Sequence, residues 1–329
     1  MKFLFKKIIT VVLIVFIIAA ITRVGTAVAE EVEENELTSE AAIVIDFCTG
    51  LVIFELNADE QRVPASMTKM IAVFVVMDAI KAGQISFDSN VIIGESTSIF
   101  SYNRGYSNVP LPANSSYTIR ELLDVVIVRS ASAATIALGE ALFGSENAFV
   151  AKMNEKMTHL GIEASFFDSW GGSPNNRISA RGMAEITRIL INEHPEVLDF
   201  TSQSSVTFDE IEYRSTNLLL REYEGIDGLK TGFTNPAGWC FTGTALQEDR
   251  RIISVTMGSV QGNRFTDSVI LLDHGFENYG ITIANHFRNA IQQPDIEQNI
   301  GFLIPITTYN IDLAKYIELR ALALILNDY

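Results

Sequence analysis

The fold of this chain is decided by one predicted helix that begins with a serine and a lysine: residues 64–83 read PASMTKMIAVFVVMDAIKAG. Apolar side chains occur on nearly every face of the helix predicted for residues 66–82, and Lys81 and Gly83 are typical of its end. A helix that is apolar all round belongs inside a domain. We therefore expect the core to form around this segment, with Ser66 and Lys69 at a buried helix start.

Strand patterns lie on both sides of this helix. Upstream, residues 41–46 and 51–56 are rich in β-branched side chains and flank Thr49 and Gly50, which predicts a β-hairpin. Downstream, three further strands are predicted at residues 226–233, 239–245 and 251–258. The domain thus has a strand-forming region near each of its ends.

Helices are predicted for the middle of the chain. Thr118 and Glu121 form a capping box that opens a helix to about residue 129. Further helices are predicted at residues 146–160 and 263–276. Strands at both ends with helices between them predict an α+β fold, in which the terminal hairpin joins the later strands in one antiparallel sheet. A parallel sheet would instead need strands and helices to alternate throughout.

The composition is typical of a folded protein without a nucleic-acid partner. Of the 329 residues, 48% are hydrophobic, which is enough for a large core. The 40 acidic residues outnumber the 24 basic ones and give a net charge of −16. Such a charge repels phosphate backbones, and no run of lysines or arginines lies outside the first seven residues. We therefore expect no nucleic-acid binding.

Neither a metal nor a cofactor is expected. The two cysteines, Cys48 and Cys240, form no Cys-x-x-Cys pair, and the four histidines form no His-Glu-x-x-His motif. A disulfide between the cysteines would fit an oxidising compartment. We instead place both in strands, as buried thiols that no disulfide joins.

The first residues predict where the chain is sent. Three lysines within the first seven residues precede an apolar run over residues 8–21, and the small-residue sequence AVA follows at residues 27–29. This pattern is typical of a secretory signal peptide over residues 1–29, with an acidic linker over residues 30–40 behind it. The alternative, a retained membrane anchor, needs roughly 20 apolar residues. We expect a secreted or extracytoplasmic protein.

The first candidate site is the pair Ser66 and Lys69. Residues three apart on a helix share a face, so the Lys69 amine is expected beside the Ser66 hydroxyl. A serine hydroxyl is a poor nucleophile until a base takes its proton, and a desolvated lysine loses enough basicity to act as that base. Because Ser-x-x-Lys also occurs by chance, the alternative is a helix cap followed by a surface lysine. The apolar helix argues against an exposed Lys69.

Two further motifs lie on later elements. Lys230, Thr231 and Gly232 follow one another on a predicted strand, where a lysine and a hydroxyl can hold a carboxylate and a glycine lets another chain approach closely. Ser130 and Ser132 follow the capped helix. Each motif alone is common, and a charged edge strand or a polar helix end would explain it. Together with the Ser-x-x-Lys pair, they form the three-motif set of penicillin-interacting serine enzymes.

With this set the chain resembles the low-molecular-weight penicillin-binding proteins that are serine-type D-alanyl-D-alanine carboxypeptidases, the peptidase S11 family. The resemblance extends over roughly residues 40–280. Its most specific stretch is DGLKTGFTNPAGWC at residues 227–240. Further matching stretches are residues 64–69, 122–138, 151–154 and 271–276.

The resemblance implies a fold and a set of catalytic roles. The fold is that of the serine β-lactamases and transpeptidases, with an antiparallel sheet and a large helical subdomain. Ser66 would be the acylated nucleophile, Lys69 its base, and Ser130 the hydroxyl that relays the proton to the leaving group.

The resemblance also implies a substrate-binding set. Lys230, Thr231 and Arg264 would hold the terminal carboxylate of the substrate. Ser132 would contact the substrate's peptide group, and Gly232 and Phe233 would lie beside the reacting carbonyl. The backbone N–H groups of Ser66 and Phe233 would form the oxyanion hole.

The implied activity is that of an extracytoplasmic D-alanyl-D-alanine carboxypeptidase of the cell envelope. Such a hydrolase trims the terminal D-alanine of peptidoglycan stem peptides through an acyl-serine intermediate and needs no cofactor. β-Lactam antibiotics would acylate the same serine as covalent inhibitors. Peripheral membrane association is left open by the sequence.

This chain departs from the family in two places. The family's middle motif is usually Ser-x-Asn followed by Asp-Ala, where this chain has Ser132, Ala133 and Ala134. A serine reaches less far than an amide, and one lost substrate contact is worth about 1–3 kcal/mol, so we expect reduced activity. The second departure is at the C-terminus. We expect a carboxypeptidase domain over residues 41–280, and behind it, at residues 281–329, a C-terminal segment that is shortened relative to the family. This segment has a helical candidate at residues 311–326.

Two other functions remain as alternatives. A weakly active or inactive peptidoglycan-binding homologue would explain Ser132 and Ala133. A class A β-lactamase would need a glutamate that activates a deacylating water, but residues 165–181 contain none. Covalent attachment of labelled penicillin to Ser66 would separate an enzyme from an inactive homologue.

Overall fold

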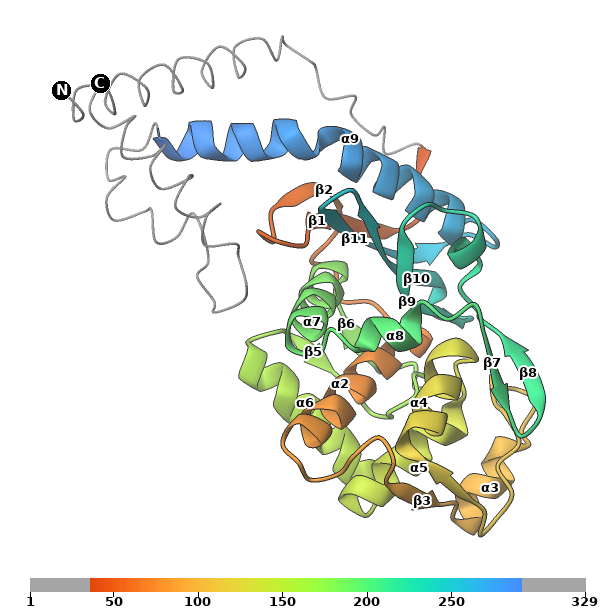
Figure 1. Ribbon diagram of the computed structural model, residues 1–329. Coiled ribbons are helices and arrows are strands. Elements are labelled where there is room, and N and C mark those ends of the chain that lie inside the picture. The colour runs from red at the N-terminus through yellow and green to blue at the C-terminus, as the bar shows by residue number, and fades with distance from the viewer. Residues whose placement is uncertain (1–35, 292–329) are drawn as a thin grey trace, which may run out of the picture. The chain divides into compact units, whose positions relative to one another are not determined.

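The computed structural model describes residues 36–291 of the chain (Figure 1). The predicted signal peptide, most of the acidic linker and the helical candidate at residues 311–326 lie outside the described residues. Within them, the main sheet contains β1 (Ala41–Asp46), β2 (Val52–Leu56), β9 (Ile226–Thr234), β10 (Gly238–Gln247) and β11 (Arg250–Ser259). Smaller two-stranded sheets pair β3 (Asn90–Ile92) with β4 (Ser116–Thr118), β5 (Ala164–Ser165) with β6 (Arg177–Ile178), and β7 (Ser205–Phe208) with β8 (Ile211–Arg214).

Most helices lie between β2 and β9, as predicted. They are the 3₁₀ turn η2 (Ala65–Met67), α2 (Thr68–Lys81), α3 (Glu95–Ser101), α4 (Ile119–Val128), α5 (Ser132–Phe143), α6 (Glu146–Leu160), α7 (Ala180–Glu193), α8 (Val197–Thr201) and the 3₁₀ turn η3 (Leu218–Arg221). The last helix is α9 (Arg264–Ile291), which continues past the predicted end at residue 276. The capping box of Thr118 and Glu121 opens α4, which confirms that prediction.

The main sheet has the strand order β2-β1-β11-β10-β9, and all neighbouring strands are antiparallel. The terminal hairpin therefore joins the three later strands, as predicted. Successive side chains of β1 point into different cores: Ile43 and Ile45 enter the larger one, and Ala42 and Val44 enter the smaller one. Because both faces of the sheet are covered, β1 is apolar along most of its length.

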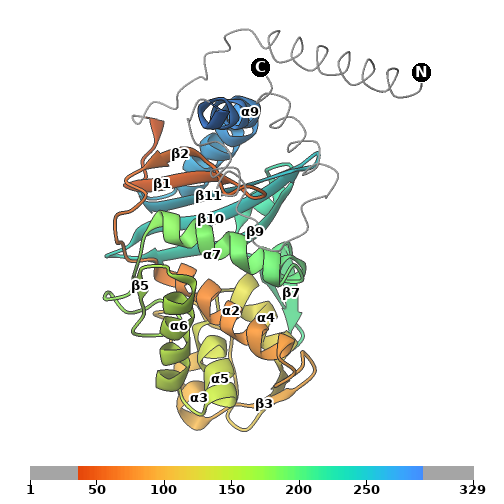
Figure 2. The ribbon, with the colours of Figure 1, turned by 90° about the vertical axis from the view of Figure 1, so that its left-hand side faces the viewer.

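Helices cover the two faces of the sheet (Figure 2). On one face, Leu271 and Leu272 of α9 pack with Val44 and Ile252 in the smaller core. On the other face lies α7, and the helical subdomain continues from there around α2. This separation of a sheet from a group of helices confirms the predicted α+β fold.

Helix α2 forms the centre of the helical subdomain. Its side chains are buried on nearly every side, among them Met70, Phe74 and Met77, and α4, α5, α6 and α7 all contact it. The uniform apolar pattern of the sequence therefore predicted its burial correctly. Helix α5 was not predicted, because it starts directly at the Ser130–Ser132 motif, whose small polar residues are also typical of the end of a helix.

The cysteines follow the prediction only in part. Cys240 is a free, buried thiol of β10, so no disulfide joins it to Cys48. Cys48, however, is exposed in the turn after β1, where we expected a buried strand residue. The strand ends at Asp46, because its carboxylate closes this turn by accepting from the Thr49 N–H at 2.6 Å. Within residues 36–291, no helix is both long and apolar enough to cross a membrane.

We predict that Gly139→Ala destabilises the protein, although alanine is the better helix former. Gly139 is buried in α5, and a Cβ atom there would lie 2.2 Å from Phe149 Cδ1 of α6. Such overpacking costs about 1–3 kcal/mol, while alanine gains only about 1 kcal/mol over glycine in a helix. Urea unfolding should show a lower midpoint. In a Phe149→Leu background the loss should be smaller, and equal losses in both backgrounds would contradict a contact at Gly139.

Candidate active site

Ser66 and Lys69 lie where the 3₁₀ turn η2 runs into α2. We expected both on one α-helix, but Ser66 belongs to η2 and Lys69 to the first turn of α2. Since a 3₁₀ turn has about three residues per turn, residues three apart lie above one another. Lys69 Nζ accordingly donates to Ser66 Oγ at 3.0 Å. The lysine side chain is 0% exposed, so the alternative of a surface lysine is wrong.

The Lys69 amine has two further acceptors. Its Nζ lies 3.3 Å from Ser132 Oγ and 2.6 Å from the backbone oxygen of Trp170. Burial lowers the pKa of Lys69 to about 7, although the neighbouring Asp168 acts in the opposite direction and raises it. A large part of the amine is therefore neutral at physiological pH, and neutral Lys69 can accept a proton from the Ser66 hydroxyl.

Ser130 lies in a strained loop between α4 and α5. Its φ is +63°, in the left-handed region that costs energy for a residue other than glycine. Its Oγ is buried and has no hydrogen-bond partner among the described residues. Because buried hydroxyls are nearly always bonded, this group is suited to bond with a ligand.

Strand β9 lies directly against η2 and so meets Ser66. A Cβ atom at Gly232 would be 2.7 Å from Pro64 O and 3.3 Å from Ser66 N. Only glycine allows this approach, which the Lys-Thr-Gly motif predicted. Thr231, the preceding residue, is buried, and its Oγ1 donates to Thr216 Oγ1 at 2.8 Å.

Two buried basic side chains lie on this side of the site. Lys230 donates to the backbone oxygen of Thr231 at 3.1 Å, and its pKa is far below the ordinary value because of burial and then of the charges of Lys69 and Arg264. Arg264 donates to the backbone oxygen of Gly232 at 3.1 Å, while its buried Nε has no partner among the described residues. Burial lowers the pKa of Arg264 to about 10, which leaves it charged at neutral pH. These groups favour a small anion such as a carboxylate.

The remaining residues of the site come from strands and loops around it. Phe233 is 47% exposed, and its ring packs on Trp239 with 4.5 Å between centroids. Trp170 and Asn108 were not predicted: Asn108 Oδ1 accepts from the Ala133 N–H at 2.8 Å, next to the middle motif. Trp170 contacts Lys69 through its backbone oxygen, so no side-chain pattern could have identified it.

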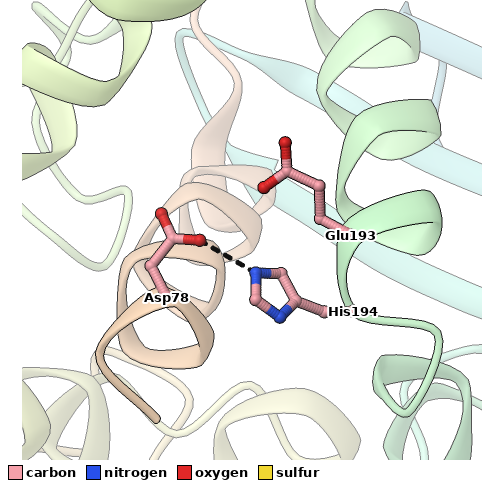
Figure 3. A group of neighbouring side chains, drawn as sticks. All are labelled: Asp78, Glu193 and His194. Carbon is pink, nitrogen blue, oxygen red and sulfur yellow. Dashed lines mark hydrogen bonds and ion pairs between the residues drawn. The ribbon is translucent and has the colours of Figure 1, made fainter. Parts of the chain in front are cut away.

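One group outside this site has the residue types of a metal centre. Asp78, Glu193 and His194 place three ligand atoms within 4.8 Å of one another (Figure 3). Lys156 Nζ, however, lies 2.9 Å from Asp78 Oδ2 and 3.6 Å from Glu193 Oε2. His194 Nε2 lies 2.8 Å from Asp78 Oδ1. Because Lys156 already contacts both carboxylates, we interpret this group as an ion-pair cluster that joins α2, α6 and the end of α7.

The sequence is similar to that of a known peptidase family. A family model described as D-alanyl-D-alanine carboxypeptidase matches residues 27–261. The D-alanyl-D-alanine carboxypeptidase DacA of Haemophilus influenzae is 34% identical over 252 residues, which cover 74% of this chain and 63% of that protein. The chain thus spans less than two thirds of the length of this relative.

Solved structures agree with this result. Penicillin binding protein 5 from Haemophilus influenzae has a TM-score of 0.72 at 33% identity, and the match covers 75% of this chain and 73% of that one. Penicillin-Binding Protein D2 from Listeria monocytogenes, in its ampicillin bound form, has a TM-score of 0.64 at 31% identity and matches over 73% of this chain and 98% of that one. These similarities confirm the transpeptidase-like fold that the sequence resemblance implied.

We predict that the reaction of Ser66 with a fluorescent penicillin depends on pH through Lys69. Only the neutral amine accepts the serine proton, so the second-order rate constant should rise with pH through a midpoint of about 7 and then level off. Lys69→Arg keeps its proton and should lower the rate by about 100-fold or more at every pH. A rate in the wild type that stays constant from acid to alkaline pH would contradict a lysine base.

Proposed function

The chain belongs to the D-alanyl-D-alanine carboxypeptidase family, and we propose that it removes the terminal D-alanine from peptidoglycan stem peptides. One observation carries this proposal: the 3.0 Å contact between Lys69 Nζ and Ser66 Oγ, in which a completely buried lysine meets a serine at the edge of β9. The strained Ser130 and the buried basic side chains of Lys230 and Arg264 support it, because each offers a polar group to a ligand.

In the proposed reaction, Ser66 is the nucleophile and Lys69 the general base. Neutral Lys69 takes the proton of Ser66 Oγ while this oxygen bonds to the carbonyl carbon of the penultimate D-alanine. The C–N bond to the terminal D-alanine then breaks, and the leaving nitrogen takes a proton that Ser130 relays. Water next attacks the acyl-serine ester, which releases the shortened peptide and restores the Ser66 hydroxyl.

Substrate selection would depend on the carboxylate of the terminal D-alanine. We assign Lys230, Thr231 and Arg264 to this group, since a carboxylate would compensate buried positive charge and accept from the Arg264 Nε. The backbone N–H groups of Ser66 and Phe233 would donate to the oxyanion of the tetrahedral intermediate. The close packing of Gly232 on η2 supports this pairing, because it brings the two stretches of backbone together.

The same geometry supports acylation of Ser66 by β-lactams, whose strained amide takes the place of the peptide bond. A related protein, from Listeria monocytogenes, was solved in an ampicillin bound form. We place the activity outside the cytoplasm, at the cell envelope, where peptidoglycan lies and where the predicted signal peptide would direct the chain.

A second candidate function is that of a peptidoglycan-binding homologue with little activity. The observation in its favour is Ser132, which contacts Lys69 at 3.3 Å in the place of the family's longer asparagine. A class A β-lactamase is less well supported. The loop over residues 166–176 contains no glutamate, and it meets Lys69 through the backbone oxygen of Trp170.

The release of D-alanine from diacetyl-L-lysyl-D-alanyl-D-alanine tests the proposed function. We expect the wild type to release D-alanine, and Ser66→Ala to lose at least about 1,000-fold in kcat/KM because no acyl-enzyme forms. The same peptide with a C-terminal amide should react at least about tenfold more slowly, since it lacks the carboxylate. Equal activity of Ser66→Ala would contradict the proposal. A wild type that penicillin labels but that releases no D-alanine would favour the second candidate.

We also predict that Ser132→Asn increases the carboxypeptidase rate. The longer amide can bond to the substrate's peptide group while it still accepts from Lys69. We expect kcat/KM to rise by about tenfold, which corresponds to about 1.4 kcal/mol of transition-state stabilisation. The control is Ser132→Ala, which should be slower than the wild type. If Ser132→Ala matches the wild type and the asparagine variant is slower, residue 132 does not bind the substrate.

A further inference from the structure

The loop over residues 166–176 is organised around the carboxylate of Asp168. Its Oδ1 accepts from the Gly171 N–H at 2.7 Å and from Asn176 Nδ2 at 3.0 Å, and its Oδ2 accepts from the Ser173 N–H at 2.5 Å. Asn176 in turn donates to Thr68 Oγ1 of α2 at 3.2 Å. One side chain therefore closes the loop on itself and, through an amide, ties it to the first residue of α2.

This loop lies against the reacting groups. The backbone oxygen of Trp170 accepts from Lys69 Nζ at 2.6 Å, which is the shortest of the three contacts of the amine. Gly171 has a φ of +88°, and a Cβ atom there would lie 2.9 Å from Ser66 N, so the two backbones pack without space for a side chain. The position of the Trp170 carbonyl therefore depends on the turn that Asp168 closes.

Of the charged and basic groups around this site, one carboxylate acts on Lys69 itself. Asp168 raises the pKa of Lys69 and so opposes the larger effect of burial. Strand β9 contributes Lys230, whose pKa is lowered by burial and then by the charges of Lys69 and Arg264, and α9 contributes Arg264, which stays charged at neutral pH. Glu146 of α6 accepts from the backbone N–H and the hydroxyl of Ser169 in the same loop, and it does not act on Lys69. Among the described residues, Asp168 is thus the acid whose charge acts on the base.

We propose that Asp168 is a positioning residue for the acylation of Ser66, and that it acts through Lys69. Its carboxylate fixes the Trp170 carbonyl against the amine, and its negative charge keeps this buried amine basic enough to take the serine proton. The inference rests on the proposed function, because it concerns the same base. A neutral side chain at this position should therefore change the pH at which the enzyme gains activity, as well as its rate.

The test is the pH dependence of acylation by a fluorescent penicillin in the wild type, Asp168→Asn, Asp168→Glu and Glu146→Gln. In Asp168→Asn the loss of charge should lower the midpoint of the acid limb by about one pH unit, and the weaker base should lower the plateau rate by about tenfold. Asp168→Glu keeps the charge but moves the carboxylate, so it should lower the plateau and keep the midpoint. Glu146→Gln is the matched control: it turns another carboxylate on this loop into an amide and should keep the wild-type midpoint.

The midpoint separates this role from a merely structural one. An unchanged midpoint in Asp168→Asn would overturn the proposal whatever the plateau rate, and so would an equal shift in Glu146→Gln. If circular dichroism shows that Asp168→Asn does not fold, Asp168→Ser replaces it as the variant with a neutral side chain. The midpoint of Asp168→Ser is then compared with that of the wild type in the same way. A wild type that penicillin fails to acylate would overturn the proposed function and this inference together, whereas an acylated wild type with unshifted variants overturns the inference alone.

Discussion

The packing of β9 on the 3₁₀ turn η2 is the contact on which the rest of the site depends. Gly232 has no side chain, so the strand can approach the Pro64 carbonyl and the Ser66 nitrogen directly. At this contact the main sheet meets the helical subdomain that surrounds α2. The sheet, with the helix α9 that packs on it, contributes Lys230 and Arg264. The helical subdomain contributes Ser66 and Lys69. Neither half alone holds both a nucleophile and a binding site for an anion.

The electrostatics of this contact are costly for folding and useful for catalysis. Lys69 and Lys230 are completely buried and Arg264 nearly so, although the whole chain has a net charge of −16. Burying charges without full compensation opposes folding, and such groups cluster at functional sites. A bound carboxylate would compensate Lys230 and Arg264, while Asp168 acts on Lys69. The site therefore combines a lysine that is neutral enough to act as a base with basic side chains that can hold the carboxylate end of a peptide.

The sequence predicted the parts of the structure that depend on local pattern. The apolar helix α2, the hairpin of β1 and β2 and the strands β9 to β11 follow from periodicity, and the contact of Ser66 with Lys69 follows from a spacing of three residues. The roles of the Trp170 backbone oxygen and of Asp168 could not be predicted, because their loop is distant in sequence and meets Lys69 only through tertiary packing, with the Trp170 oxygen as the contact and Asp168 closing the turn behind it. The place of Arg264 came from the family resemblance alone, since no local pattern links α9 to β9.

The structure of the protein with a covalently bound ampicillin tests this account most directly, because one ligand must engage both halves of the site. The account predicts an ester between the drug and Ser66 Oγ, with the drug's carboxylate within hydrogen-bond distance of Thr231 and of Lys230 or Arg264. An ester on another residue would contradict it. So would an ester on Ser66 whose carboxylate points away from β9 and the first turn of α9, since the two halves would then not form one site.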